Sequence, residues 1–372
     1  MDVKLSEKHS LVTYSIHTLI ILSICMFMLF SITDVSMSLY GKRNFVLNES
    51  KDGTIANIYK YKRDKKALKY PVKIDQTLVK LINWTDPEYP LDVSYLIENK
   101  DLCASVKNLT VLVVVNTATD HFGRRQTIRK TWTNNTYFSH LGTLRTLFLL
   151  GRTVDTSIQA DIEKESKEYG DILQGDFMDT YLNLTHKGVM GLKWLNERCR
   201  NAKMILKVDD DFIVNIFIYF RKIGKSLPST HVYCLYGTDG VIRDKENKWY
   251  LSENHFKGEK IYREHCKGKF VSMRNDIIPS LYISARKTPF FPYDDVTLFG
   301  YAMHNIKGLR YKTLEQKDME NVNSLAITCL KEQKNKCPNL VIGAPKRKEM
   351  EDAWLMMLKF FSPKSHSLYM KV

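Results

Sequence analysis

The stretch KMILKVDDDFIVN, residues 203–215, decides the fold that we expect for this chain. Its first half is apolar apart from one lysine and is short, which is typical of a buried strand. The strand ends in three acids, Asp209, Asp210 and Asp211. Ligands of open α/β sheets bind beyond the carboxyl ends of the strands, so these acids are expected to face a crevice.

Three adjacent carboxylates repel one another, and a divalent cation would neutralise them. Oxygen ligands of this kind suit Mg²⁺ or Mn²⁺. An ion held there could also bind a diphosphate. For the three acids alone, a solvated acidic loop is an equally good interpretation, so the rest of the sequence has to decide.

Length and composition indicate a globular protein. The chain has 372 residues, 44% of them hydrophobic, which is enough for one large or two ordinary domains with a real core. A net charge of +15 raises the question of a nucleic-acid partner. The basic residues are dispersed, apart from clusters at 62–69 and 346–348, and no RNA- or DNA-binding motif accompanies them. We therefore expect no nucleic-acid partner.

An apolar segment near the start of the chain indicates a membrane anchor. Residues 10–33 contain no Asp, Glu, Lys or Arg, and a helix rising about 1.5 Å per residue over this length can cross a hydrocarbon layer of roughly 30 Å. A cleaved signal peptide is the alternative, but its apolar region is normally about 7–15 residues long. We predict a cytosolic tail (1–9), one transmembrane signal anchor (10–33), a polar luminal stem (34–103) and a folded domain (104–372).

The cysteines and glycosylation sequons agree with a luminal domain. Seven cysteines are present, and the six outside the apolar segment would allow up to three disulfides in an oxidising compartment. Only the pair Cys329 and Cys337 is close enough in sequence to suggest itself, and no CxxC zinc pattern occurs. Sequons occur at Asn48, Asn83, Asn108, Asn134 and Asn183.

Strand and helix patterns alternate from residue 109 onward. Runs rich in β-branched and other apolar residues predict strands, and charged or amphipathic runs predict helices between them. Such alternation implies right-handed βαβ crossovers and a three-layer α/β domain. The expected strands are 109–118, 144–151, 171–177 and 204–208, then 231–237, 247–251 and 268–273; the expected helices are 122–132, 158–169, 181–199 and one ending near 287.

Five stretches of the chain resemble one known family. The chain is similar to the β1,3-galactosyltransferases and β1,3-N-acetylglucosaminyltransferases of glycosyltransferase family 31, which are related to the Fringe enzymes. The resemblance covers about residues 109–308 and follows the family's order of motifs. The matching stretches are RRQTIRKTW (124–132), FLLG (148–151), GDFMDTYLNLTHKGVMGLKWLNERC (175–199), KVDDDFIVN (207–215) and YDDVTLFG (293–300).

The resemblance implies a Rossmann-like GT-A catalytic domain in a type II membrane protein of the Golgi or ER. It also implies a UDP-sugar donor, Mn²⁺ or Mg²⁺, and a β1,3 linkage formed with inversion. Galactose is the expected sugar, with N-acetylglucosamine or N-acetylgalactosamine as alternatives, and the acceptor is a glycan on a glycoprotein or glycolipid. A catalytically silent member, acting as a chaperone or a sugar-binding module, is the alternative outside the enzyme class.

The resemblance also assigns roles to the acids. Asp211 is expected to bind the metal, and Asp209 to contact the nucleotide or a metal-bound water. Asp210 belongs to the same nucleotide-binding group, but its side chain is expected on the other side of the strand end, where it supports the loop. Asp295 is the expected general base that takes the proton of the acceptor hydroxyl. Asp294 stands beside it, where two neighbouring acids can raise one pKa.

Several basic and aromatic residues have two interpretations. Arg124 and Arg129 could bind the diphosphate or form structural ion pairs. Lys207 could lie near the nucleotide or on a solvated face. Trp132 and Trp194 are expected in the core rather than as platforms for a sugar.

The chain departs from the family pattern at YREHCKGKF, residues 262–270. The family's YPxYCSGGGY/F stretch is rich in glycine there, which permits close approach of the backbone. Lys267 and Lys269 could therefore change the sugar specificity or impair activity. Related enzymes often use a later histidine in the metal site, and only His304 and His366 follow Asp295.

Overall fold

The computed structural model describes residues 68–82, 93–224 and 227–362. The chain divides into two units, Met1–Lys65 and Lys66–Val372, and all described residues belong to the second. The predicted anchor at residues 10–33 lies outside the described residues. Within the described ranges, no helix combines the length and the apolar character that spanning a membrane requires.

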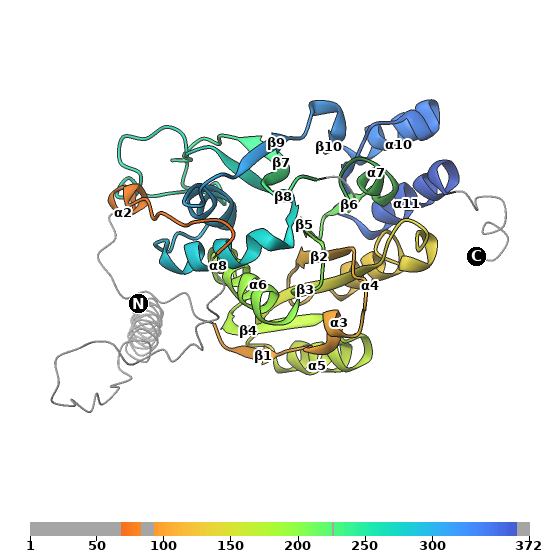
Figure 1. Cartoon of the computed structure of the whole chain (residues 1–372), viewed down its shortest axis with the longest axis horizontal. Coiled ribbons are helices and arrows are strands. Elements are labelled where there is room, and N and C mark those ends of the chain that lie inside the picture. The colour runs from red at the N-terminus through yellow and green to blue at the C-terminus, as the bar shows by residue number, and fades with distance from the viewer. Residues whose placement is uncertain (1–67, 83–92, 225–226, 363–372) are drawn as a thin grey trace, which may run out of the picture. The chain divides into compact units, whose positions relative to one another are not determined.

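An eight-stranded mixed sheet forms the centre of the second unit (Figure 1). Its strand order is β1-β4-β3-β2-β5-β8-β7-β9. The neighbours β4, β3, β2 and β5 run parallel, whereas β1, at one edge, is antiparallel to β4, and β8 is antiparallel to both β5 and β7. The strands are β1 (Tyr95–Ile97), β2 (Val111–Asn116), β3 (Leu144–Arg152), β4 (Ile172–Met178), β5 (Met204–Asp209), β7 (His231–Gly237), β8 (His265–Arg274) and β9 (Arg310–Thr313).

Helices cover both faces of this sheet, which confirms the predicted three-layer arrangement. On β2, Val111, Val113 and Val115 pack into one hydrophobic cluster, while Leu112 and Val114 pack into another. The first cluster includes residues of α4, α5 and α11, and the second includes residues of α6 and α8. The longer helices are α4 (Phe122–Lys130), α5 (Thr156–Tyr169), α6 (Leu184–Arg198), α8 (Ile278–Lys287), α10 (Asn323–Gln333) and α11 (Arg347–Phe361); the short ones are α2 (Thr77–Leu81), α3 (Asp101–Ala104), α7 (Ile216–Tyr219) and α9 (Asp294–Val296).

A second, three-stranded sheet fixes the segment that follows the acids. Its strand order is β10 (Met319–Glu320), β11 (Val341–Gly343) and β6 (Phe212–Val214), so β11 is the middle strand. Strands β6 and β11 are antiparallel, and the backbone N–H of Ala344 donates to the carbonyl oxygen of Asp211 at 2.7 Å. A strand from late in the chain therefore holds the backbone of the acidic stretch.

The folded unit includes residues that the sequence assigns to the stem at 34–103. Strand β1 pairs with β4, the side chains of Tyr70 and Leu78 are buried, and Cys103 forms a disulfide with Cys199. The helices and the strand of this region, α2, α3 and β1, are only three to five residues long. Such short elements produce no sustained hydrophobic period, so the sequence pattern did not reveal them.

Most other expected elements are present, with two differences. Residues 247–251 form turns and a single bridge from Tyr250 to Ile242 rather than a strand. Leu182, which was expected on the buried face of α6, lies in the preceding 3₁₀ turn and is 59% exposed. The predicted disulfide between Cys329 and Cys337 is confirmed, and the remaining pairs are Cys103–Cys199 and Cys234–Cys266.

Candidate active site

The three acids lie where two parallel strands end. Strands β2 and β5 pair in register up to Asn116 opposite Asp209. The backbone N–H of Asp210 then donates to the carbonyl oxygen of Asn116 at 3.1 Å. Parallel neighbours end at the same edge of a sheet, so the side chains that follow β2 and β5 come together there.

The side chain of Asp210 anchors the loop after β2 and the start of α4. Its buried carboxylate accepts a hydrogen bond from Thr117 at 2.6 Å and from Arg124 at 2.8 Å, and it lies 2.7 Å from His121 Nδ1. Burial alone would raise the pKa of Asp210, but the hydrogen bonds with His121 and Thr117 outweigh it and lower the pKa. This is the supporting position that we expected for its side chain.

Asp209 is paired with a lysine from its own strand. The ammonium of Lys207 lies 2.7 Å from Asp209 Oδ1 and donates to the carbonyl oxygen of Gly268 at 2.7 Å. Burial raises the pKa of Asp209 to about 6, against the opposing charge of Lys207. Burial opposes the charge on Lys207, but Asp209 and Asp294 raise the pKa of the ammonium and keep it protonated.

The second acidic group, Asp294 and Asp295, approaches the first group, at residues 209–211, at Lys207. Asp294 is buried, and its Oδ2 lies 3.6 Å from Lys207 Nζ and accepts from the Asn116 amide at 3.3 Å. Asp295 follows on the same short helix, α9. Burial, followed by the charge of Asp294, raises the pKa of Asp295. Two acidic groups that are far apart in sequence thus belong to one site.

Asp211 differs from its two neighbours. Within the described residues, no basic side chain forms an ion pair with its carboxylate, whereas Asp209 pairs with Lys207 and Asp210 pairs with Arg124. Burial, together with the charge of Asp210, raises the pKa of Asp211. Of the three acids, Asp211 is therefore the one whose charge no ion pair of the described residues balances.

Gly268 allows β8 to approach the acids closely. A Cβ atom at this position would lie 2.9 Å from Lys207 Nζ and 3.7 Å from the Cβ of Asp295. The family pattern has several glycines in this stretch, and Gly268 is the one that this chain retains at the site. Lys267 extends from the same strand to Asp239 Oδ1, at 2.6 Å.

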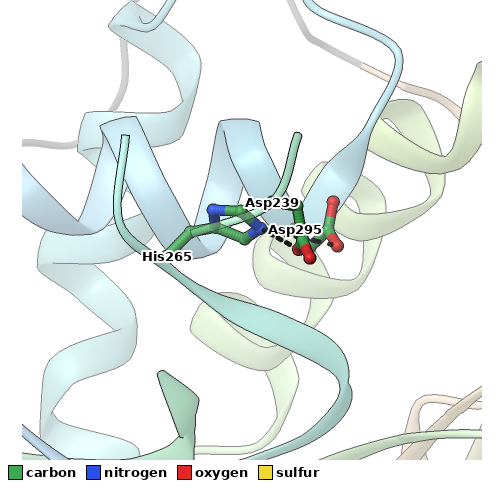
Figure 2. A group of neighbouring side chains, drawn as sticks. All are labelled: Asp239, His265 and Asp295. Carbon is green, nitrogen blue, oxygen red and sulfur yellow. Dashed lines mark hydrogen bonds and ion pairs between the residues drawn. The ribbon is translucent and has the colours of Figure 1, made fainter. Parts of the chain in front are cut away.

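A histidine that the sequence did not single out also belongs to the site. His265 is fully buried, and its Nε2 lies 3.1 Å from Asp239 Oδ2 and 3.9 Å from Asp295 Oδ2 (Figure 2). Burial opposes protonation of His265, but the hydrogen bond with Asp239 outweighs it and raises the pKa. His265 lies in the departing stretch YREHCKGKF and Asp239 follows the end of β7. An acid just after a strand end was the available signal for Asp239.

The two arginines have different positions. Arg124 contacts Asp210 at the carboxyl edge of the strands. Arg129 pairs with Glu165 at 2.6 Å and Asp171 at 2.8 Å, and Asp171 immediately precedes β4. Arg129 therefore lies at the opposite edge of the sheet, where the parallel strands begin. Of its two interpretations, these contacts are those of a structural ion pair.

Within the described residues, the remaining candidates form no hydrogen bond or ion pair with the five acids. Trp132 and Trp194 are fully buried in the two large hydrophobic clusters, as expected of core residues. His304 Nε2 lies 3.2 Å from the Tyr236 hydroxyl, and burial lowers the pKa of this histidine to about 4. A depression of about 850 Å³ lies at the amino edge of the strands and includes Arg129 in its lining.

Comparison with known proteins gives a family match and curated relatives. The family model described as Galactosyltransferase matches residues 123–314. Over 218 residues the chain is 33% identical to beta-1,3-galactosyltransferase 1 of Mus musculus and of Homo sapiens, covering 57% of this chain and 65% of each relative. Over 202 residues it is 34% identical to the Homo sapiens acetylgalactosaminyl-O-glycosyl-glycoprotein beta-1,3-N-acetylglucosaminyltransferase, covering 52% of both chains.

Among solved structures, one similar chain is a glycosyltransferase involved in the glycosylation of the major capsid of PBCV-1. The two share 13% sequence identity at a TM-score of 0.34, covering 66% of this chain and 98% of the other.

Proposed function

Because the chain belongs to the galactosyltransferase family, we propose that it transfers galactose from UDP-galactose to a glycan hydroxyl, forming a β1,3 linkage with inversion. The observation that carries this proposal is the meeting of two acidic groups at Lys207, whose ammonium is 2.7 Å from Asp209 and 3.6 Å from Asp294. The acids at 209–211 would bind the sugar donor, and the acids at 294–295 would act on the acceptor. The mixed sheet and the site at its carboxyl edge support a GT-A type of fold.

Asp211 is the residue that would hold a divalent metal, Mn²⁺ or Mg²⁺. Its carboxylate is half-buried and, within the described part of the chain, has no ion pair of its own, which fits a hard cation shared with the donor's diphosphate. When bound, the ion supplies Lewis-acid stabilisation of the negative charge that develops on the leaving UDP. Asp209 and Arg124 would position the nucleotide beside it.

Asp295 would act as the general base. Its carboxylate takes the proton from the acceptor hydroxyl while that oxygen forms a bond to the sugar's anomeric carbon and the bond from that carbon to UDP breaks. Burial and Asp294 raise the pKa of Asp295, and a base of higher pKa accepts this proton more readily. Lys207 balances the charge of the neighbouring acids.

N-acetylglucosamine is the second candidate for the transferred sugar. It is favoured by the 34% identity to the human beta-1,3-N-acetylglucosaminyltransferase, which is as high as the identity to the galactosyltransferases. The side chains that select the sugar are few, so both donors belong in the first experiment.

We place the protein in the Golgi or ER membrane with its folded unit in the lumen. The apolar segment 10–33 supports a signal anchor. The three disulfides of the described residues support an oxidising compartment. Digestion of sealed microsomes with a protease tests this topology, because a luminal unit is protected until detergent is added.

The transferase activity is tested with the full chain in detergent. UDP-galactose, UDP-N-acetylglucosamine and UDP-N-acetylgalactosamine are offered with a panel of glycan acceptors, in Mn²⁺ or in EDTA. We expect transfer that EDTA abolishes and that falls at least about 100-fold in Asp211→Asn and in Asp295→Asn. The matched control is Asp161→Asn on α5, whose side chain is exposed. Binding of UDP-sugar without transfer to any acceptor would overturn the proposal and favour a silent member.

A further inference from the structure

We propose that Asp239, His265 and Asp295 form a binding site for a transition-metal ion of the Zn²⁺ type, separate from the site at Asp211. One ligand atom of each residue lies within 4.8 Å of the others. Within the described ranges, this is the one group of three or more such side chains that is close enough to share an ion. Asp211 does not belong to it.

The spacing of the ligand atoms suits a small ion. Zn²⁺ binds nitrogen and oxygen at about 2.0–2.2 Å in a tetrahedron, which puts ligand atoms roughly 3.3–3.5 Å apart. His265 Nε2 lies 3.1 Å from Asp239 Oδ2 and 3.9 Å from Asp295 Oδ2, on either side of that value. The Asp295 side chain is 31% exposed, so its carboxylate has room for the small rotation required. The fourth position would remain for solvent.

The groups behind these ligands have the arrangement that metal sites use. His265 Nδ1 lies 2.8 Å from the carbonyl oxygen of Arg263, so its N–H can donate there, while Nε2 faces the two carboxylates (Figure 2). Without an ion, a proton on Nε2 makes the hydrogen bond to Asp239, and a bound ion would replace that proton. A backbone carbonyl or a carboxylate on the other ring nitrogen is the usual partner of a metal-binding histidine. Lys267 binds Asp239 through Oδ1, which leaves Oδ2 toward the histidine.

The charges at this cluster decide which ion is expected. With the ion in place of the Nε2 proton, two carboxylates and a neutral imidazole offset a divalent cation, and the Lys267 ammonium beside Asp239 limits its affinity. A nitrogen ligand favours Zn²⁺ or Co²⁺, whereas all-oxygen sites suit Mg²⁺ and Mn²⁺. Three protein ligands can bind the ion in the absence of nucleotide. The Asp211 site offers one carboxylate without an ion pair, so binding there would depend on the diphosphate.

Occupancy of this cluster would regulate the transferase, an expectation that rests on the proposed function. The ion would coordinate Asp295 Oδ2, and a coordinated carboxylate is a poor acceptor for the proton of an incoming hydroxyl. Zn²⁺ would therefore slow transfer even when Mn²⁺ saturates the donor site.

Binding is measured first, without nucleotide, on the metal-free full chain with a chromophoric zinc indicator as competitor. We expect the wild type to bind one more Zn²⁺ than His265→Gln and Asp239→Asn, and Asp211→Asn to bind as many as the wild type. In Co²⁺ the same site would give visible absorption bands of a tetrahedral ion, which Asp239→Asn removes. Equal stoichiometry in the wild type and both cluster variants, or loss of the ion in Asp211→Asn, would overturn the proposal.

The design keeps the two proposals distinguishable. Asp239 is 43% exposed on its side chain, so Asp239→Asn provides a folded variant even if replacement of the buried His265 disrupts the protein. With transfer detected, we expect the Zn²⁺ concentration for half-inhibition to rise at least 10-fold in Asp239→Asn, and an unchanged value would refute the regulatory role. If no transfer is detected, the proposed function fails, while the Zn²⁺ stoichiometry still decides the metal site.

Discussion

The ammonium of Lys207 lies 2.7 Å from the carboxylate of Asp209, and the side chain of this lysine is only 8% exposed. The same ammonium is 3.6 Å from Asp294 and is held by the carbonyl oxygen of Gly268. One positive charge therefore keeps two acidic groups of the chain together.

Replacing this charge should destabilise the folded unit. In Lys207→Met the carboxylates of Asp209 and Asp294 lose their shared partner, and removing one member of a buried ion pair typically costs about 3–5 kcal/mol. We expect the free energy of unfolding, measured in urea at pH 7, to fall by about 3 kcal/mol. The control is Lys203→Met, an exposed lysine just before β5. Equal unfolding midpoints for the two variants would show that Lys207 is not needed for this charge balance.

The charge of Asp294 should determine the pH range of activity. Burial raises the pKa of Asp295, and Asp294 raises it further. A base works only when deprotonated, so transfer is lost as the pH falls through this pKa. Asp294→Asn removes the second cause and lowers the pKa, so the acid limb of kcat/KM should move to lower pH. A limb that stays in place, measured beside Asp161→Asn as control, would argue against Asp295 as the base.

Arg129 should matter for stability and not for the donor. It pairs with Glu165 and Asp171, and burial raises the pKa of Asp171. We expect Arg129→Met to lower the free energy of unfolding by about 3 kcal/mol and to leave KM for UDP-galactose within about twofold. The comparison is Arg124→Gln, next to Asp210. A large rise in KM for Arg129→Met at unchanged kcat would restore its predicted role at the diphosphate.

The disulfides that close the longest and the shortest loop should contribute unequally to the free energy of unfolding. The bond Cys103–Cys199 closes 96 residues and Cys329–Cys337 closes eight. In the chain-entropy model these loops correspond to about 4.7 and about 2.5 kcal/mol. Replacing each pair by alanine should therefore lower the free energy of unfolding more for the first pair than for the second. Comparable losses would indicate that the entropy of the unfolded chain is not the main effect.

The sequence predicted the central layer of the fold because strong patterns mark it. The apolar runs of β2, β3 and β5 are buried and continuous, and the helices between them have clear periods. Strand β1 and helices α2 and α3 are too short to show a hydrophobic period. The sequence therefore assigned them to the stem at 34–103, although they belong to the folded unit. The boundary depended on contacts such as β1 with β4, which no local pattern reports.

The residues of the candidate site were predictable where they follow strand ends. Asp209, Asp210 and Asp211 come directly after a buried strand, and family resemblance supplied Asp294 and Asp295. His265 could not be found in this way, because it lies at the start of β8 in the stretch where the chain departs from the family pattern. The position of Arg129 depended on which edge of the sheet its partners occupy, and that follows from topology rather than from its own motif.

The pairing of β6 with β11 has a consequence for biosynthesis. The acidic stretch is translated more than a hundred residues before the strand that fixes it, so on the ribosome the carbonyl oxygen of Asp211 has to wait for the backbone N–H of Ala344. A nonsense or frameshift allele that truncates the polypeptide between the YDDVTLFG stretch (293–300) and Ala344 would retain all five family-like stretches, yet it would lack the strand that pairs with the segment after the acids. Genetic variants of this kind should be scored as null despite an intact signature.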